Sequence, residues 1–241
     1  MNTHHQEILH QIKEKSGKPT QHTALDNYLG NSHFRYPISI PVLRSIGKTW
    51  MKENAGELSL NAFTTLLTSL TRGESSTEKT MAGILLDYAP AALRQFDPKL
   101  FDRWLGPLQG WAEVDTLCTG VYSSTEIANQ FTAWKNVLLD FTKSKQIEKR
   151  RASLVLLVSP LLKARNANVV KIAFQNINRL KQEKEVMITK AISWLLRSAI
   201  KYHKAEVAVF IEEQNETLPR IALRETLIKL KTGKKTKSKK T

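Results

Sequence analysis

Apolar side chains recur at every third or fourth position along most of the chain, the spacing of one face of an α-helix. The clearest case is residues 57–73, which end at Gly73, a residue that commonly follows a helix. The next segment, residues 75–90, opens on a serine cap with an acid close behind it and closes at Pro90. The pattern predicts one helix in each segment, and the apolar stripe of the first consists of Leu58, Leu60, Phe63, Leu66, Leu67 and Leu70.

The same helical spacing continues near the C-terminus. Residues 205–230 indicate two helices that are split near Asn215–Pro219. We find neither alternating strand patterns nor Asn-Gly hairpin turns, and the 10 glycines and 8 prolines mostly mark helix ends. The sequence therefore predicts an all-α fold.

Four similar segments indicate an internal repeat. Lys79, Asp115, Arg151 and Lys190 hold equivalent places in them, at separations of 36, 36 and 39 positions. A period of this length with two helices in each repeat is typical of HEAT-like repeats, which stack into a solenoid, a superhelix with a concave face. An irregular helical bundle remains the alternative. The segments are EKTMAGILLDYA, EVDTLCTGVYSS, KRRASLVLLVSP and ITKAISWLLRSA.

In a solenoid, equivalent positions of successive repeats line up along one surface. Asp115, Arg151 and Lys190 would then form a row on the concave face. Trp111 precedes Asp115 by one helical turn, and Trp194 follows Lys190 by one turn. The spacing predicts that a carboxylate, a guanidinium and two indoles converge on one groove.

Length and composition restrict the class of protein. The 241 residues suit a single HEAT-like domain over residues 1–230. The longest apolar runs are too short to cross a bilayer, and the N-terminus lacks the apolar core of a signal peptide, so we expect a soluble, cytoplasmic monomer without a membrane partner. Cys118 is the only cysteine and is expected to be buried, and the six histidines form no metal set. The sequence implies no metal and no cofactor.

Positive charge is concentrated in the second half of the chain. Residues 142–241 hold 24 Lys and Arg against 8 Asp and Glu, whereas residues 1–141 hold 13 against 14. The predicted groove is therefore basic and suits a polyanion. We expect residues 231–241, the lysine-rich tail, to be disordered. It is either a solubilising end or a non-specific phosphate contact.

These residues resemble the AlkD family of DNA alkylation repair glycosylases. WAEVD at 111–115 is similar to the motif that supplies the family's catalytic aspartate and one indole, and RRASLVL at 150–156 to its arginine segment. KAISWLLR at 190–197 resembles the segment of the second indole. YLGNSHFRYPISIPVLRSI at 28–46 and LPRIALRETLIKL at 218–230 are similar to the family's N-terminal entry and closing helix. The resemblance covers residues 25–230.

The resemblance implies a monofunctional glycosylase that removes cationic N3- or N7-alkylated purines from duplex DNA. Asp115 would stabilise the oxocarbenium-like sugar and orient water, while Arg151 would hold a phosphate beside the lesion. Trp111 and Trp194 would face the cation with their rings. The residues that contact substrate or flanking DNA would be Tyr28, Arg150, Lys190 and Arg197.

Each of these residues also has a purely structural interpretation. A tryptophan on a helix is more often core than catalytic, and we assign Trp50, Trp104 and Trp134 to the core. Asp115 could brace its helix, and Arg151 and Arg197 could be ordinary surface charges. The alternative function is a non-catalytic HEAT-like module that binds damaged or branched DNA or a protein partner.

Overall fold

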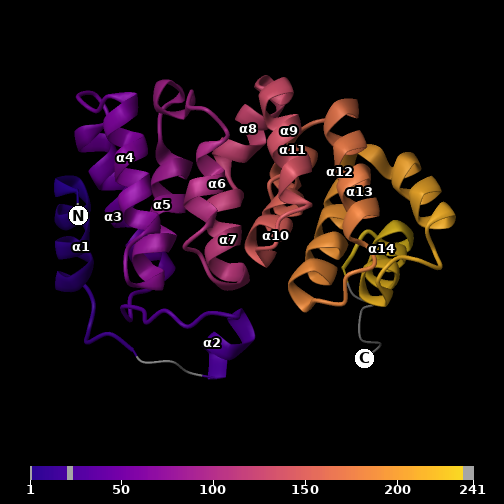
Figure 1. The fold of residues 1–241 in the computed structure, drawn as a ribbon, viewed down its shortest axis with the longest axis horizontal. Helices are drawn as coiled ribbons and strands as arrows, with labels where there is room; N and C mark the ends of the chain where they lie inside the picture. The colour runs from indigo at the N-terminus through magenta and orange to yellow at the C-terminus, as the bar shows by residue number, and fades with distance from the viewer. Residues whose placement is uncertain (1, 21–23, 236–241) are drawn as a thin grey trace. The chain divides into compact units, whose positions relative to one another are not determined.

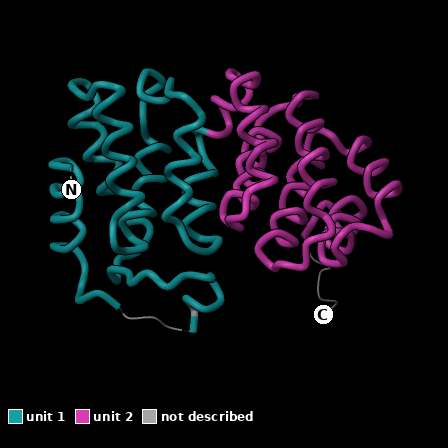
Figure 2. Tube along the Cα trace, viewed as in Figure 1, with its two compact units in different colours: residues 1–122 teal, residues 123–241 magenta. Residues whose placement is uncertain are grey.

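The computed structural model describes residues 2–20 and 24–235. Its helices pack as two compact units, residues 1–122 and 123–241 (Figure 2). No strand occurs in the described ranges, where one isolated bridge joins Thr20 and Arg35. The all-α prediction is confirmed.

The helices of residues 1–122 lie in two rows (Figure 1). Helices α3, α5 and α7 contact one another in turn, and α1, α4 and α6 form the second row. This arrangement of helix pairs is the one that a HEAT-like repeat requires. The elements are α1 (Thr3–Glu14), α2 (Ala24–Leu29), α3 (Ile40–Asn54), α4 (Leu60–Thr71), α5 (Ser76–Tyr88), the 3-10 helix η1 (Ala91–Arg94), α6 (Leu100–Leu105) and α7 (Gly110–Cys118).

Residues 123–241 repeat the pattern. Helix α10 packs on α13, and α9 packs on α12, while α13 also contacts α14. Helix α13 is kinked at His203, whose φ of −131° and ψ of 40° are not helical. The remaining elements are α8 (Val121–Asn129), which spans the boundary between the units, α9 (Phe131–Phe141), α10 (Ile147–Val155), α11 (Val158–Lys163), α12 (Ala167–Leu180), α13 (Val186–Glu213) and α14 (Arg220–Thr232).

The helix ends follow the signals in the sequence. Helix α4 begins after Ser59, whose side chain accepts a hydrogen bond from the backbone of Ala62. Helix α5 begins with a full capping box between Ser75 and Glu78 and ends before Pro90. The predicted split near Asn215–Pro219 separates α13 from α14.

One expectation about helix limits is confirmed and one needs correction. Residues 186–213 form two helices joined across a kink at His203, so the second of them begins close to residue 205, as predicted. The lysine-rich tail was expected to lack structure from residue 231, yet α14 continues to Thr232 and ends at Gly233, which has the left-handed φ of 71°. Residues 236–241 of the tail lie outside the described residues.

Large aromatic side chains form much of the core. Trp50 and Trp104 are buried in residues 1–122, and Trp134 is buried in residues 123–241, so the prediction that these three belong to the core is confirmed. Cys118 is also buried, as expected. Burial of these rings by neighbouring helices adds to the apolar stabilisation supplied by the many buried aliphatic side chains of each unit.

Candidate active site

Helix α7 carries the two residues at the centre of the prediction, Trp111 and Asp115. The helix starts at Gly110, whose φ is +69°. A Cβ at this position would lie 2.1 Å from the carbonyl oxygen of Leu29. Only glycine allows the turn after α2 to approach the start of α7 this closely. The close approach brings Tyr28 to Trp111.

Trp111 is held at the surface by the backbone of Tyr28. Its indole Nε1 donates a 3.1 Å hydrogen bond to the carbonyl oxygen of Tyr28. The two rings meet edge to face, with centroids 5.7 Å apart and planes at 85°. The Tyr28 residue is 59% exposed and Trp111 is partly exposed. The pair therefore forms a fixed aromatic edge that remains open to a ligand.

Asp115 follows Trp111 by one turn on α7 and is also partly exposed. Its backbone carbonyl accepts hydrogen bonds from the backbone N–H of Thr119 at 3.0 Å and from the hydroxyl of Thr119 at 2.7 Å. These bonds close the C-terminal end of α7. Asp115 therefore lies on a short helix that has contacts at both ends.

Lys79 occupies the equivalent repeat position on α5, but it is held in the interior. The residue is 2% exposed, and its Nζ donates to the backbone carbonyls of Thr71 and Gly73. Burial lowers the pKa of Lys79, and the negative charges of Glu113 and Glu78 oppose that effect. Lys79 therefore braces the loop between α4 and α5.

In residues 123–241, the two arginines of α10 make different contacts. Arg151 is 4% exposed, and its Nη1 donates to the backbone carbonyl of Met187 in the first turn of α13. Arg150 makes a two-pronged ion pair with Glu183, with Nε–Oε1 at 2.8 Å and Nη2–Oε2 at 3.1 Å. Its Nη1 also donates to the carbonyls of Ser144 and Lys145. Most of the Arg150 donors are therefore used inside the protein.

Lys190 and Trp194 are both partly exposed and lie one turn apart on α13. Arg197 follows one turn later, where its Nε donates to the hydroxyl of Ser193 at 3.2 Å and lies 3.3 Å from Oε2 of Glu225 on α14. The Ser193 hydroxyl in turn donates to Glu225 at 2.6 Å. These contacts fix the side chains on both sides of Trp194.

Arg197 belongs to a partly buried positive cluster. Burial lowers the pKa of Arg197, and the charge of Glu225 opposes that effect. Burial also lowers the pKa of Lys229 on α14, and repulsion from Arg197 lowers it further. Arg197 and Lys229 are thus neighbouring cations, of which Arg197 is paired with Glu225.

The structure brings the predicted residues together in two sets. Tyr28, Trp111 and Asp115 lie together in residues 1–122, on α2 and α7. The other set lies in residues 123–241, on the packed helices α10 and α13, and consists of Arg150, Arg151, Lys190, Trp194 and Arg197. That both sets act on one nucleotide stays a prediction.

Two carboxylates that support these sets were not predicted from the sequence. Glu113, the central residue of the WAEVD motif, is fully buried. Glu225 on α14 pairs with Arg197. From the sequence, Glu113 could be recognised only as an acid in the first turn of a helix, where a negative charge is favourable. Its partners Asn31 and His33 could not be predicted, because they lie about eighty positions away in the sequence.

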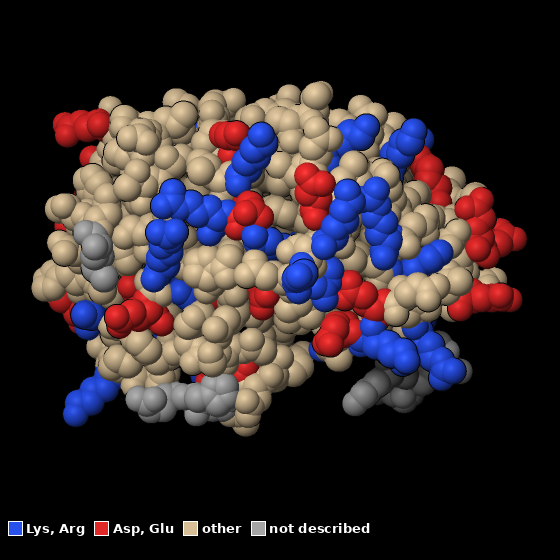
Figure 3. Space-filling view, in the orientation of Figure 1, with Lys and Arg blue, Asp and Glu red and all other residues tan. Residues whose placement is uncertain are grey.

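The surface charge agrees with the uneven sequence charge. Figure 3 shows Lys and Arg side chains gathered over residues 123–241 on the drawn face, with Asp and Glu among them. Within the described ranges, no group of three or more His, Cys, Asp or Glu residues is arranged to hold a metal ion. No helix in the described part of the chain has the length and apolar character needed to cross a membrane.

Comparison with known proteins gives a family. A family model described as DNA alkylation repair enzyme matches residues 12–230. Among solved structures, the chain is similar to a predicted DNA alkylation repair enzyme from Enterococcus faecalis, with 17% sequence identity and a TM-score of 0.64. The similarity covers 84% of this chain and 91% of that one, which shows a shared fold. The search of curated proteins gave no match.

Proposed function

The chain belongs to the DNA alkylation repair enzyme family, and we propose that it is a monofunctional DNA glycosylase for cationic N3- and N7-alkylated purines. Its substrate would be duplex DNA that carries such a base. The observation that carries the proposal is the arrangement on α7. A carboxylate and an indole lie one turn apart at the surface, and the indole is held edge-on to an exposed tyrosine.

The chemistry needs one negative group near C1′ of the sugar. An alkylated purine carries a formal positive charge, which weakens its bond to the sugar. When that bond breaks, its electron pair moves to the base and neutralises the charge, and the sugar acquires oxocarbenium character. Water then forms the new bond to C1′ and loses a proton. The Asp115 carboxylate suits both tasks, stabilisation of the cation and orientation of the water.

A single carboxylate is enough for such a substrate. Most glycosidases need a second carboxyl group to protonate the leaving group. A base that leaves as a neutral molecule does not need that proton. The proposed enzyme would therefore act on cationic lesions and fail on neutral ones.

The other predicted residues would bind the cationic sugar and the DNA backbone. The faces of Trp111 and Trp194 carry negative electrostatic potential that attracts a cation. Lys190 and Arg197 would contact flanking phosphates. Arg151 would contact the phosphate beside the lesion only after its buried guanidinium leaves the carbonyl of Met187. Arg150 would contribute less, since Glu183 and two carbonyls already bind most of its donors.

The test is release of 7-methylguanine from methylated duplex DNA by the wild type and by Asp115→Asn. We expect the substitution to slow release by about 100-fold or more, the usual cost of removing a charge-stabilising group. DNA affinity should stay the same or increase, because a negative charge near phosphates is lost. Asp140→Asn is the matched control, since it makes the same change at an exposed position on α9.

Two outcomes would overturn the proposal. Equal release by Asp115→Asn and the wild type would remove Asp115 from the mechanism. Binding to DNA without any release by the wild type would favour the alternative, a non-catalytic HEAT-like module that binds damaged or branched DNA.

A further inference from the structure

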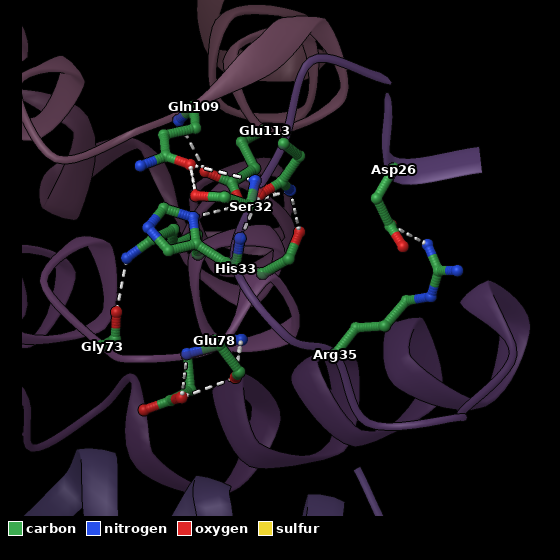
Figure 4. Close-up of polar contacts among 12 residues, drawn as sticks. Asp26, Ser32, His33, Arg35, Gly73, Glu78, Gln109 and Glu113 are labelled. Atoms are coloured by element: carbon green, nitrogen blue, oxygen red, sulfur yellow. Dashed lines mark hydrogen bonds and ion pairs between the residues drawn. The ribbon is translucent and has the colours of Figure 1, made fainter. Parts of the chain in front are cut away.

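A buried carboxylate lies on α7 two residues after Trp111, which forms an aromatic edge with Tyr28. Glu113 is fully buried on α7, between Trp111 and Asp115 in the sequence. Its side chain accepts hydrogen bonds from three residues in two different parts of the chain. Figure 4 shows it beside Ser32, His33 and Gln109.

Both carboxylate oxygens of Glu113 are used as acceptors. Oε1 accepts from Asn31 Nδ2 at 2.8 Å and from His33 Nδ1 at 3.0 Å. Oε2 accepts from the backbone N–H of Gln109 at 2.8 Å. Because a carboxylate has no hydrogen to donate, Nδ1 of His33 must carry the proton in this bond. Glu113 thus ties the segment after Tyr28 to the residue that precedes α7.

Other contacts join the same two segments. The backbone N–H of Ser32 donates to Oε1 of Gln109 at 3.0 Å, and Trp111 Nε1 donates to the carbonyl of Tyr28. Asn31 also donates from its backbone to the carbonyl of Asp26 at 2.9 Å, which closes the turn after α2. The buried positive charge of Lys79 attracts Glu113 from α5. A buried carboxylate with this many partners fixes the positions of the two segments that donate hydrogen bonds to it.

We propose that Glu113 is a positioning residue, which holds the aromatic edge of Tyr28 and Trp111 in place relative to Asp115. This inference rests on the proposed glycosylase function for its catalytic consequence, but its structural part can be tested without DNA. Glu113 would not contact the substrate. It would act through its hydrogen bonds with Asn31, His33 and Gln109, which hold the segment after Tyr28 against the start of α7.

Glu113→Gln is the informative substitution because the side chain keeps its shape. Glutamine offers one acceptor oxygen and one NH2 group that only donates. In one orientation the NH2 faces the backbone N–H of Gln109, and in the other it faces the donors of Asn31 and His33. Either orientation sets a donor against a donor, so at least one bond is lost.

Glu78→Gln is a matched control in the same unit. Glu78 is 2% exposed and also accepts several hydrogen bonds, from His5 Nε2 at 2.8 Å and from Ser75. Its hydrogen bonds join His5 on α1 to Ser75 before α5 and do not involve Tyr28 or Trp111. Both substitutions should lower stability, whereas only Glu113→Gln should move the edge.

The first readout is ¹⁹F NMR of protein labelled with 5-fluorotryptophan, with the Trp111 signal assigned by its loss in Trp111→Phe. We expect Glu113→Gln to shift or broaden the Trp111 signal and Glu78→Gln to leave it unchanged. The second readout is single-turnover release of 7-methylguanine, which Glu113→Gln should slow by about tenfold or more because small misplacements of reacting groups are costly.

His33→Ala keeps the proposal testable if Glu113→Gln does not fold, since it removes one donor from a partly exposed site. It should produce a smaller change of the same kind. An unchanged Trp111 signal in both variants would overturn the positioning role, and so would an equal shift in Glu78→Gln. If the wild type releases no base while the NMR shift is present, the proposed function fails and the positioning role stands.

Discussion

Single residues determine how closely the segments around α7 can approach one another. Gly110 has a left-handed φ, and the carbonyl of Leu29 occupies the space where any other side chain would begin. The sequence pointed to Trp111 and Asp115 through their motif and spacing. It did not reveal Gly110 or Glu113, because the reason for each residue is a contact with residues 29–33, far away in the sequence.

Replacement of Gly110 by alanine should destabilise the protein. A left-handed φ costs a residue with a side chain about 1–2 kcal/mol, and the contact with Leu29 adds to that cost. We expect the Tm, followed by far-ultraviolet circular dichroism, to fall by about 5 °C or more.

Gly56→Ala is the control for that experiment. Nothing lies within 4 Å of a Cβ at Gly56, so the substitution should leave the Tm nearly unchanged. A Tm for Gly110→Ala equal to that of Gly56→Ala would contradict the account of how α7 is placed.

At the scale of elements, helix ends were the best-predicted features. The capping box at Ser75 and the proline at position 90 set the limits of α5, because they act on neighbouring backbone groups. The sequence predicted that a helix begins at residue 205, but not the contacts made at the kink of α13 at His203. His203 Nε2 accepts from the backbone N–H of Asn166 at 3.2 Å, and its other ring nitrogen lies 3.1 Å from Glu206. The kink accompanies contacts with a distant loop, which local sequence signals do not contain.

The capping box of α5 also ties that helix to α1, and this link should depend on pH. Burial raises the pKa of Glu78, but hydrogen bonds from His5 and Ser75 outweigh it, so the pKa lies below its ordinary value of 4.5. A lowered pKa means that the carboxylate stabilises the fold above pH 4.5. This stabilisation is lost as the pH falls through the lower pKa of the folded protein.

We therefore expect Glu78→Gln to lower the Tm at pH 7, and the difference from the wild type to shrink as the pH falls below 4.5. Thermal unfolding measured between pH 7 and pH 3 would show this. Glu53→Gln, at an exposed position on α3, should show no such difference. A difference for Glu78→Gln that stays constant over this range would mean that Glu78 is not the group responsible.

At the scale of the whole molecule, the sequence predicted the helical class and the repeat, but not the boundary between the two compact units. The all-α fold followed from periodicity, and the repeat spacing put Asp115 on α7 and Arg151 on α10, both in rows of packed helices. The contacts divide the chain into two compact units near residue 122, which the sequence did not indicate. The excess of positive charge lies in the second half of the chain, where non-specific phosphate contacts would add affinity without sequence preference.

The proposed mechanism depends on the positive charge of the leaving base, because one carboxylate takes the place of the two carboxyl groups that most glycosidases use. The most direct measurement is single-turnover base release from two duplexes of identical sequence, one with 7-methylguanine and one with neutral hypoxanthine, at saturating wild-type protein. The account predicts release of 7-methylguanine and no detectable release of hypoxanthine. Release of both bases at similar rates, or of hypoxanthine alone, would contradict it.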